Sequence, residues 1–207
     1  MSIISFKPKK ITKKITSPLL DRALDVITSR FGLTADGRKK TLAEIGKKYH
    51  ITRERVRQVE EAAINLIRKS NAYKSEQAIF DELKQITRNL GSIVAEHEFL
   101  PYISKDKNAQ NHINFFLVLA DVFKKHREDE HFHTHYSVDD AMTAKVQDAL
   151  KKLYANLKDE DLVPETEMIK KFLDHLKDVS EKYKSDEIMK RGLSMSKKIS
   201  KNPLGEW

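Results

Sequence analysis

Cysteine is absent from this 207-residue chain, and glycine, proline and tryptophan are scarce, at six, five and one residues. Without cysteine there is no disulfide framework, thiolate metal site or cysteine nucleophile. The chain also lacks a run of 18 apolar residues, which argues against a membrane-spanning helix, and its first ten residues lack the apolar centre of a secretory signal. A glycine-rich phosphate loop is missing as well. We therefore expect a cytoplasmic protein with no membrane span, no cofactor and no catalytic site.

Positive charge is concentrated in the first third of the chain. Residues 1–74 hold 18 Lys and Arg against 7 Asp and Glu, a net charge of +11, whereas residues 75–207 hold 21 against 24, a net charge of −3. Phosphate neutralisation and counterion release would draw DNA to the basic third. The alternative is a solvated basic surface without a partner, and charge alone does not separate the two.

The middle of the basic third has the pattern of two short helices joined by a tight turn. Thr41 and Glu44 have the spacing of a capping box, and Thr52 is placed to cap the second helix. Gly46 has no side chain where the two backbones must come close. His50 takes the turn position where glycine is usual, and histidine tolerates a left-handed backbone better than most residues. The pattern predicts a helix-turn-helix.

The second helix, over residues 52–68, has two distinct faces at 100° per residue. The residues expected to face the core are Val56, Val59, Ala63, Leu66 and Ile67. The opposite face carries Arg53, Glu54, Arg57, Gln58 and Glu61. In a major groove, arginine pairs with guanine, glutamine with adenine, and a carboxylate accepts from cytosine. The alternative, a merely solubilising face, would more often show Lys–Glu pairs four residues apart.

Three stretches resemble the fourth region of primary-type bacterial sigma factors. They read LDRALDVITSRFGL from residue 20, TLAEIG from residue 41 and ITRERVRQVE from residue 51. In that family the second helix enters the major groove of the upstream promoter hexamer. The resemblance implies that base edges are read by Arg53, Glu54 and Gln58. It implies phosphate or flanking contacts for Thr41, Lys47, Thr52, Arg55 and Arg57. It also implies docking on the flap of the RNA polymerase β subunit.

The segment before this module is basic and is bounded by Pro8 and Pro18. We expect residues 1–17 to form an N-terminal arm, which either follows a phosphate backbone or minor groove or is a solvated tail. Sigma factors open promoters with an aromatic-rich region that precedes the fourth region. Nothing similar is seen here, so we do not expect this chain to open promoters unaided.

After residue 74, apolar spacing predicts further helices. Their expected ranges are 75–90, 96–103, 109–123, 139–157, 165–176 and 184–191. A weak internal repeat relates residues 83–100 to residues 150–169. A β-hairpin is expected at 124–138 in the first copy and from 193 onward in the second, with a turn at 202–205.

This order of elements resembles winged-helix domains, including the type found in the delta subunit of some bacterial RNA polymerases. The predicted fold is mainly α, a helix-turn-helix domain followed by two helical units with small β-hairpin wings. The expected domains are the arm at 1–17, the sigma-like domain at 18–74, and winged-helix-like units at 75–138 and 139–207. The last unit would be incomplete, so we expect the native chain to continue.

The histidines at 131, 133 and 135 suggest a metal site, because three imidazoles on one face of a strand can hold zinc. We favour the alternative of an exposed hairpin edge and expect no metal. The candidate third helices of the two units, residues 108–123 and 184–191, are poor in arginine. Protein contact or scaffolding is therefore favoured over DNA reading for these units.

We predict a sequence-specific protein that binds double-stranded DNA in bacterial transcription initiation or its regulation, and not an enzyme. In this hypothesis the helix over residues 52–68 reads a promoter-like site. The alternative is an accessory protein that uses the sigma-like module to bind RNA polymerase. A metal-dependent nuclease using the histidine cluster is the least favoured hypothesis.

Overall fold

The structure is a computed structural model that describes residues 3–157, 162–176, 179–202 and 207. The chain divides into two compact units. The first comprises Met1–Leu83 and Leu100–Asp121, and the second comprises Lys84–Phe99 and Val122–Trp207. Most of the described chain is helical, which confirms the predicted fold class. Among the described residues, no helix combines the length and apolar character needed to cross a membrane.

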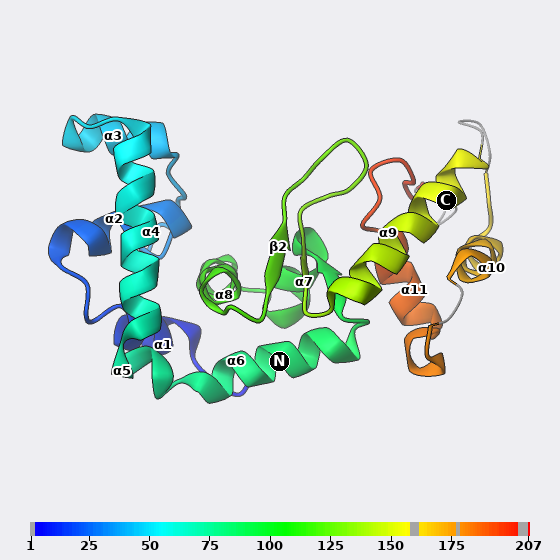
Figure 1. Ribbon diagram of the computed structural model, residues 1–207, viewed down its shortest axis with the longest axis horizontal. Helices are drawn as coiled ribbons and strands as arrows, with labels where there is room; N and C mark the ends of the chain where they lie inside the picture. The colour runs from blue at the N-terminus through cyan, green and yellow to red at the C-terminus, as the bar shows by residue number, and fades with distance from the viewer. Residues whose placement is uncertain (1–2, 158–161, 177–178, 203–206) are drawn as a thin grey trace. The chain divides into compact units, whose positions relative to one another are not determined.

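The first unit is helical (Figure 1). In chain order it contains α1 (Pro8–Ile15), α2 (Asp21–Phe31), α3 (Leu42–Tyr49), α4 (Arg53–Lys69), α5 (Asn71–Lys74), the start of α6 (Gln77–Asn89), the end of α7 (Glu96–Ile103) and α8 (Lys107–Leu119). Local signals set the helix ends. Gly32 ends α2 with a left-handed φ of 65°. Ser70 ends α4 and then caps α5, because its hydroxyl accepts from the Tyr73 amide at 3.1 Å.

Helix α8 supplies a large part of the core of the first unit. Phe115 and Phe116 are fully buried. Phe31 of α2 packs on Phe115 with ring centroids 4.9 Å apart, and Phe80 of α6 meets Phe116 edge-on at 6.2 Å. The apolar side of α2 is thus covered by α8, a helix from much later in the chain. The core of the first unit therefore continues past the domain boundary predicted after residue 74.

The basic N-terminal segment differs from the expected arm, because it forms helix α1 and packs on the unit. Ile15 is fully buried and Thr12 is 5% exposed. The Thr12 hydroxyl bonds Nδ1 of His112 in α8 at 2.8 Å. Ile11 is partly buried beside them. Pro8 occupies the first helical position, where its missing N–H costs nothing.

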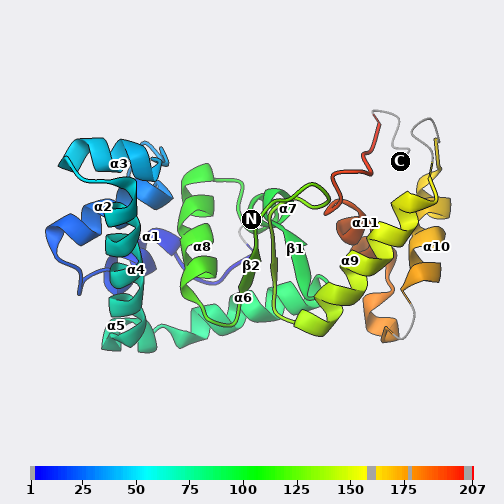
Figure 2. The same ribbon diagram turned by 45° about the horizontal axis from the view of Figure 1, so that its top comes forward.

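The second unit contains a small antiparallel sheet with strand order β1-β3-β2. Figure 2 labels its two outer strands, β1 and β2. The strands are β1 (Ile93–Ala95), β2 (Lys124–His126) and β3 (His135–Ser137). Tyr136 lies between Val94 and Lys125 in the register. The hairpin predicted at residues 124–138 is thus confirmed. The helices that follow are α9 (Asp140–Ala155), α10 (Glu165–His175) and α11 (Asp186–Leu193), with a 3-10 turn at Glu181–Tyr183.

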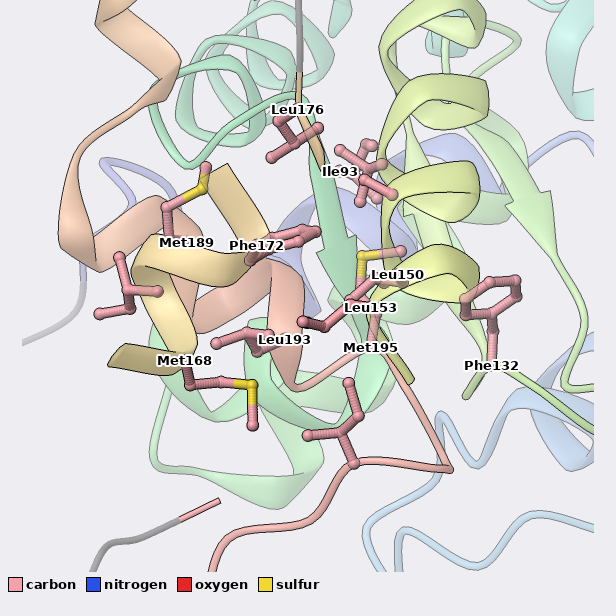
Figure 3. Close-up of a cluster of buried hydrophobic side chains, with 14 of the residues drawn as sticks. Ile93, Phe132, Leu150, Leu153, Met168, Phe172, Leu176, Met189, Leu193 and Met195 are labelled. Carbon is pink, nitrogen blue, oxygen red and sulfur yellow. The ribbon is translucent and has the colours of Figure 1, made fainter. Parts of the chain in front are cut away.

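One apolar core joins the sheet to these helices (Figure 3). It contains Ile93 of β1, Phe132 of the hairpin, Leu150 and Leu153 of α9, Phe172 of α10 and Leu193 of α11. Residues from both predicted units, 75–138 and 139–207, share this core. The two segments were expected to be separate units, but the sheet and the later helices bury one another.

The prediction of a second hairpin from residue 193 is wrong within the described residues. Helix α11 runs through Leu193, and Ser196 then forms an isolated bridge with Phe132. The carbonyl of Met195 accepts from His133 N at 2.9 Å, so this segment pairs with the first hairpin. Residues 203–205 of the expected turn lie outside the described residues. The resemblance to winged-helix domains stays a prediction.

Candidate nucleic-acid interface

The turn between α3 and α4 has the geometry predicted from its sequence. The Thr41 hydroxyl accepts from Glu44 N at 3.1 Å, and the Glu44 carboxylate accepts from Thr41 N at 2.7 Å, which completes the capping box. His50 has φ 53° and ψ 42°, a left-handed conformation. A Cβ on Gly46 would lie 2.6 Å from the carbonyl oxygen of Ile51, so only glycine fits without movement of the turn. The helix-turn-helix is confirmed.

A small core holds the three helices of the motif together. Val26 of α2, Ile45 of α3 and Val56 of α4 are fully buried, and their partly buried neighbours are Leu42, Tyr49, Ile51 and Val59. Ala63 and Ile67 are buried as expected. Leu66 was expected to face the core, but it is 47% exposed. It lies at the edge of the apolar arc, where neighbouring helices no longer cover α4.

All eight predicted contact residues are solvent-exposed. The three predicted base readers, Arg53, Glu54 and Gln58, lie in the first two turns of α4. The predicted phosphate or flanking contacts are likewise exposed, and they are Thr41, Lys47, Thr52, Arg55 and Arg57. Within the described residues, neither the Arg53 side chain nor the Lys47 side chain makes a hydrogen bond or an ion pair. Their charges are available to a ligand.

Arg57 is held by two carboxylates of its own helix. Its guanidinium donates to Glu54 at 2.6 and 2.9 Å, and it also pairs with Glu61. These hydrogen bonds hold the pKa of the Glu54 carboxyl below its usual value and raise the pKa of Arg57. One predicted base reader and one predicted phosphate contact are thus bonded to each other in the free protein.

A second pair of predicted residues is also joined. Arg55 donates to the side-chain oxygen of Gln58 at 3.0 Å. This bond fixes the orientation of the amide, and a side-chain hydrogen bond with Gln58 also helps to keep the pKa of the Glu54 carboxyl low. An adenine edge uses both the oxygen and the NH₂ group of such an amide, and the oxygen has a second lone pair that the Arg55 bond does not occupy.

Both helix caps are suited to phosphate contact. The hydroxyl of Thr52 accepts from Arg55 N at 3.1 Å, just as Thr41 accepts from Glu44 N. A threonine hydroxyl has one proton to donate as well as lone pairs that accept. Each of these two exposed threonines can therefore cap its helix and still donate to a phosphate oxygen.

Contacts between α4 and the end of α8 hold the helix-turn-helix in place, and the sequence did not predict them. Arg68, near the end of α4, donates to the last carbonyls of α8, to Leu119 O at 2.8 Å and Val118 O at 3.1 Å, and pairs with Asp121 at 3.0 Å. Cationic side chains are favourable at a helix C-terminus. The end of the recognition helix is thus fixed to α8 by a contact across about 50 residues, for which no local sequence signal exists.

A cluster of polar side chains at the edge of this small core holds α3 against α2. Asp25 accepts from Lys48 Nζ and from the Tyr49 hydroxyl, both at 2.7 Å. Burial acts to raise the pKa of Asp25, but the two hydrogen bonds outweigh it, so the pKa lies below its usual value.

Arg38, in the loop before α3, is a further exposed cation of the motif that was not predicted as a contact residue. Its guanidinium pairs with Glu44 at 3.2 Å. Three consecutive basic residues before Thr41 were the available signal.

The histidines of the hairpin lie in separate environments. Nδ1 of His131 bonds the Tyr154 hydroxyl at 2.7 Å. His133 packs edge-on against His97, and His135 stacks on His126 with centroids 4.6 Å apart. In the part of the chain that the structure describes, no group of three His, Cys, Asp or Glu residues is placed to hold a metal ion.

The comparisons with known proteins concern the helix-turn-helix segment. Residues 18–69 match the family Sigma-70, region 4. The chain is 46% identical over 59 residues to RNA polymerase sigma factor SigA of Nostoc sp., covering 28% of this chain and 15% of the relative. It is 47% identical over 57 residues to SigA1 of Synechococcus elongatus, covering 28% of this chain and 14% of that protein. For SigA of Clostridium acetobutylicum the identity is 47% over 55 residues, with shares of 27% and 14%.

The matched region is a small part of those relatives, since this chain spans about 15% of their length. No solved structure matches the chain. The match ends where α4 ends, so α1 and α8, which complete the first unit, lie outside it. Residues 18–69 match a sigma-70 region 4 domain, and this match supports a role in transcription.

Proposed function

We propose that this protein binds double-stranded DNA sequence-specifically and acts in bacterial transcription initiation or its regulation. The observation that carries the proposal is the exposed face of α4, where Arg53, Glu54 and Gln58 point away from the core formed by Val26 and Val56. A recognition helix needs this arrangement, because its polar side chains must reach base edges in the major groove.

Arg53 is the principal base reader in this proposal. Its side chain is exposed at the first position of α4 and makes no ion pair with a described residue. A free guanidinium is suited to bidentate pairing with guanine O6 and N7, because no intramolecular bond has to be broken first. Glu54 and Gln58 are bonded to Arg57 and Arg55 in the free protein, and their oxygens keep further lone pairs for a base edge, so they add to the specificity given by Arg53.

Phosphate contacts position the helix and supply most of the salt-dependent affinity. Lys47 presents a free ammonium group, and Thr41 and Thr52 present capping hydroxyls at the two helix starts. These groups act through binding alone. The protein is proposed to work in the cytoplasm, without a catalytic step.

A second candidate function is an accessory protein that occupies RNA polymerase, at the β flap, through the sigma-like module. The observation that favours it is apolar exposure within the module, since Leu20 is 81% and Leu66 47% exposed. Exposed apolar side chains are unnecessary for reading DNA, whereas the buried centre of a protein contact is more apolar than the rest of the surface.

Selection of bound sites from a random duplex pool at a fixed salt concentration tests the first function. We expect one enriched sequence, with an affinity at least about 10³-fold above that for random DNA. Capture of RNA polymerase without enrichment of any sequence would overturn the first function and support the second.

A further inference from the structure

Helix α1 carries four lysines within two turns. Lys9, Lys10, Lys13 and Lys14 are all solvent-exposed, and α1 has no acidic residue in its first turn. Lys14 pairs with Glu76. Within the described residues, Lys9, Lys10 and Lys13 have no carboxylate partner. The exposed face of α1 is therefore a surface of uncompensated positive charge.

This charge arrangement is unfavourable for the helix itself. Lys9 and Lys13 are four residues apart, as are Lys10 and Lys14, and like charges at this spacing repel. Lysines in the first turn also face the positive end of the helix dipole. Burial of His112 and the nearby charge of Lys9 both keep the pKa of the His112 imidazole below its usual value. The positive charge of Lys9 therefore acts on a buried side chain of the first unit.

Tertiary contacts hold α1 in place despite this repulsion. The Ser5 amide and hydroxyl donate to the Glu82 carboxylate at 2.7 and 2.5 Å. Ile15 is fully buried, and Thr12 bonds His112. The lysines are therefore carried on a fixed helix rather than on a free arm, so a ligand would not have to order the backbone first.

We propose that Lys9, Lys10 and Lys13 of α1 bind backbone phosphates of the duplex that α4 reads. This rests on the proposed DNA-binding function. Duplex DNA fits this surface because it carries closely spaced charges along its backbone, and lysines contact phosphates without reading sequence. Helix α1 also contacts α5, which directly follows the C-terminal end of α4 in the same unit, so these phosphates would lie outside the groove that Arg53 enters.

The test compares the full chain with the triple variant Lys9→Ala, Lys10→Ala and Lys13→Ala. Binding to a selected cognate duplex and to a random duplex of equal length is measured between about 50 and 200 mM salt. The triple variant is expected to bind both duplexes more weakly by the same factor. Its slope of log affinity against log salt should decrease by about 2.7, because each phosphate contact contributes about 0.9.

Lys14→Ala is the matched control, since Lys14 lies on the same helix but is already paired with Glu76. The slope of log affinity against log salt for this variant should differ from that of the unmodified chain by less than about 0.9, the value for one phosphate contact. Replacement of the three lysines by arginine keeps the charge, so this variant should retain the slope and exclude loss of folding as the cause. An unchanged slope in the triple alanine variant would overturn the proposal.

The random duplex separates this outcome from failure of the proposed function. If α4 reads no sequence, the cognate preference is absent, but the slope on random DNA still reports whether α1 contacts phosphates. If α4 reads sequence and the triple variant keeps its slope, only the assignment of α1 is wrong.

Discussion

The side-chain amide of Asn111 donates to the carbonyl oxygen of Gly37, 74 residues earlier, at 2.9 Å, and also to Gly32 O at 3.0 Å. Asn108, one turn before it on α8, donates to Thr34 O at 2.8 Å. The loop between α2 and α3 is thus held by amide groups from another part of the chain. This loop leads directly to Thr41, so its position sets where the helix-turn-helix begins.

Asn111→Asp should destabilise the first unit, because it replaces a donor that satisfies two carbonyls with an acceptor that repels them. We expect a loss of about 1–3 kcal/mol in the free energy of unfolding, measured by denaturant titration near neutral pH. Asn156→Asp is the control, since among the described residues the Asn156 amide bonds only the carbonyl oxygen of Lys152, in its own helix. Equal stability of the two variants would show that the contact to the loop contributes nothing.

Arg53→Ala should weaken binding to a cognate site by roughly 1–3 kcal/mol and relax the preference at one base pair. The reason is that a guanine edge would lose a bidentate partner that was free before binding. Affinity for cognate and single-substituted duplexes, compared at one salt concentration, measures both effects. A uniform loss across all duplexes would contradict the assignment of Arg53 as a base reader.

Arg57→Ala should weaken binding to all sequences and flatten the salt dependence. Besides losing one cation, the variant leaves Glu54 and Glu61 without their partner on the face that we propose meets DNA. The slope of log affinity against log salt is expected to fall by about 0.9 if one phosphate contact is lost. Equal losses on cognate and random DNA for both the Arg53 and Arg57 variants would refute the division of roles between them.

Stability of the second unit should depend on pH through the histidines of its sheet. Burial lowers the pKa of His135, and burial followed by the charge of His135 lowers the pKa of His126. The folded state therefore favours neutral rings. Stability is complete above the ordinary histidine pKa of about 6.5 and is lost as the pH falls below it through the lowered folded values.

Denaturant titrations between pH 7.5 and 5 measure this dependence. Nδ1 of His135 bonds the His133 carbonyl at 2.8 Å, and Nε2 lies 3.0 Å from the side-chain nitrogen of Gln147. Protonation of Nε2 would place two hydrogen-bond donors against each other, so the folded state disfavours the charged ring. His135→Gln should reduce the slope of stability against pH. A flat profile for the unmodified chain over this window would rule out the effect.

The helix-turn-helix was predictable because its signals are local. The Thr41 capping box, Gly46 and His50 each constrain their own turn, and the structure places them as expected. The six later helices were also found, within three residues at their starts and four at their ends, because their apolar spacing is regular. Long-range contacts have no such signal.

The remaining differences come from contacts between distant segments. No feature near Asn111 indicates that its amide meets Gly37. The lysines of α1 suggested an arm, because only Ile11 and Ile15 mark the side that packs. At the C-terminal end, the alternating residues after Leu193 suggested a separate hairpin. Their backbone instead bonds to residues 131–133, a choice of partner that alternation alone does not specify.

The pairing of Ser196 with Phe132 makes the hairpin dependent on the far end of the chain. Lys197 anchors the hairpin loop as well, through its bond to Glu128 at 2.6 Å. Proteolytic removal of the chain from Met195 onward would strip this loop of its backbone partner and uncover Phe132. Truncated forms should therefore be prone to aggregation through the sheet, even where the helix-turn-helix is untouched.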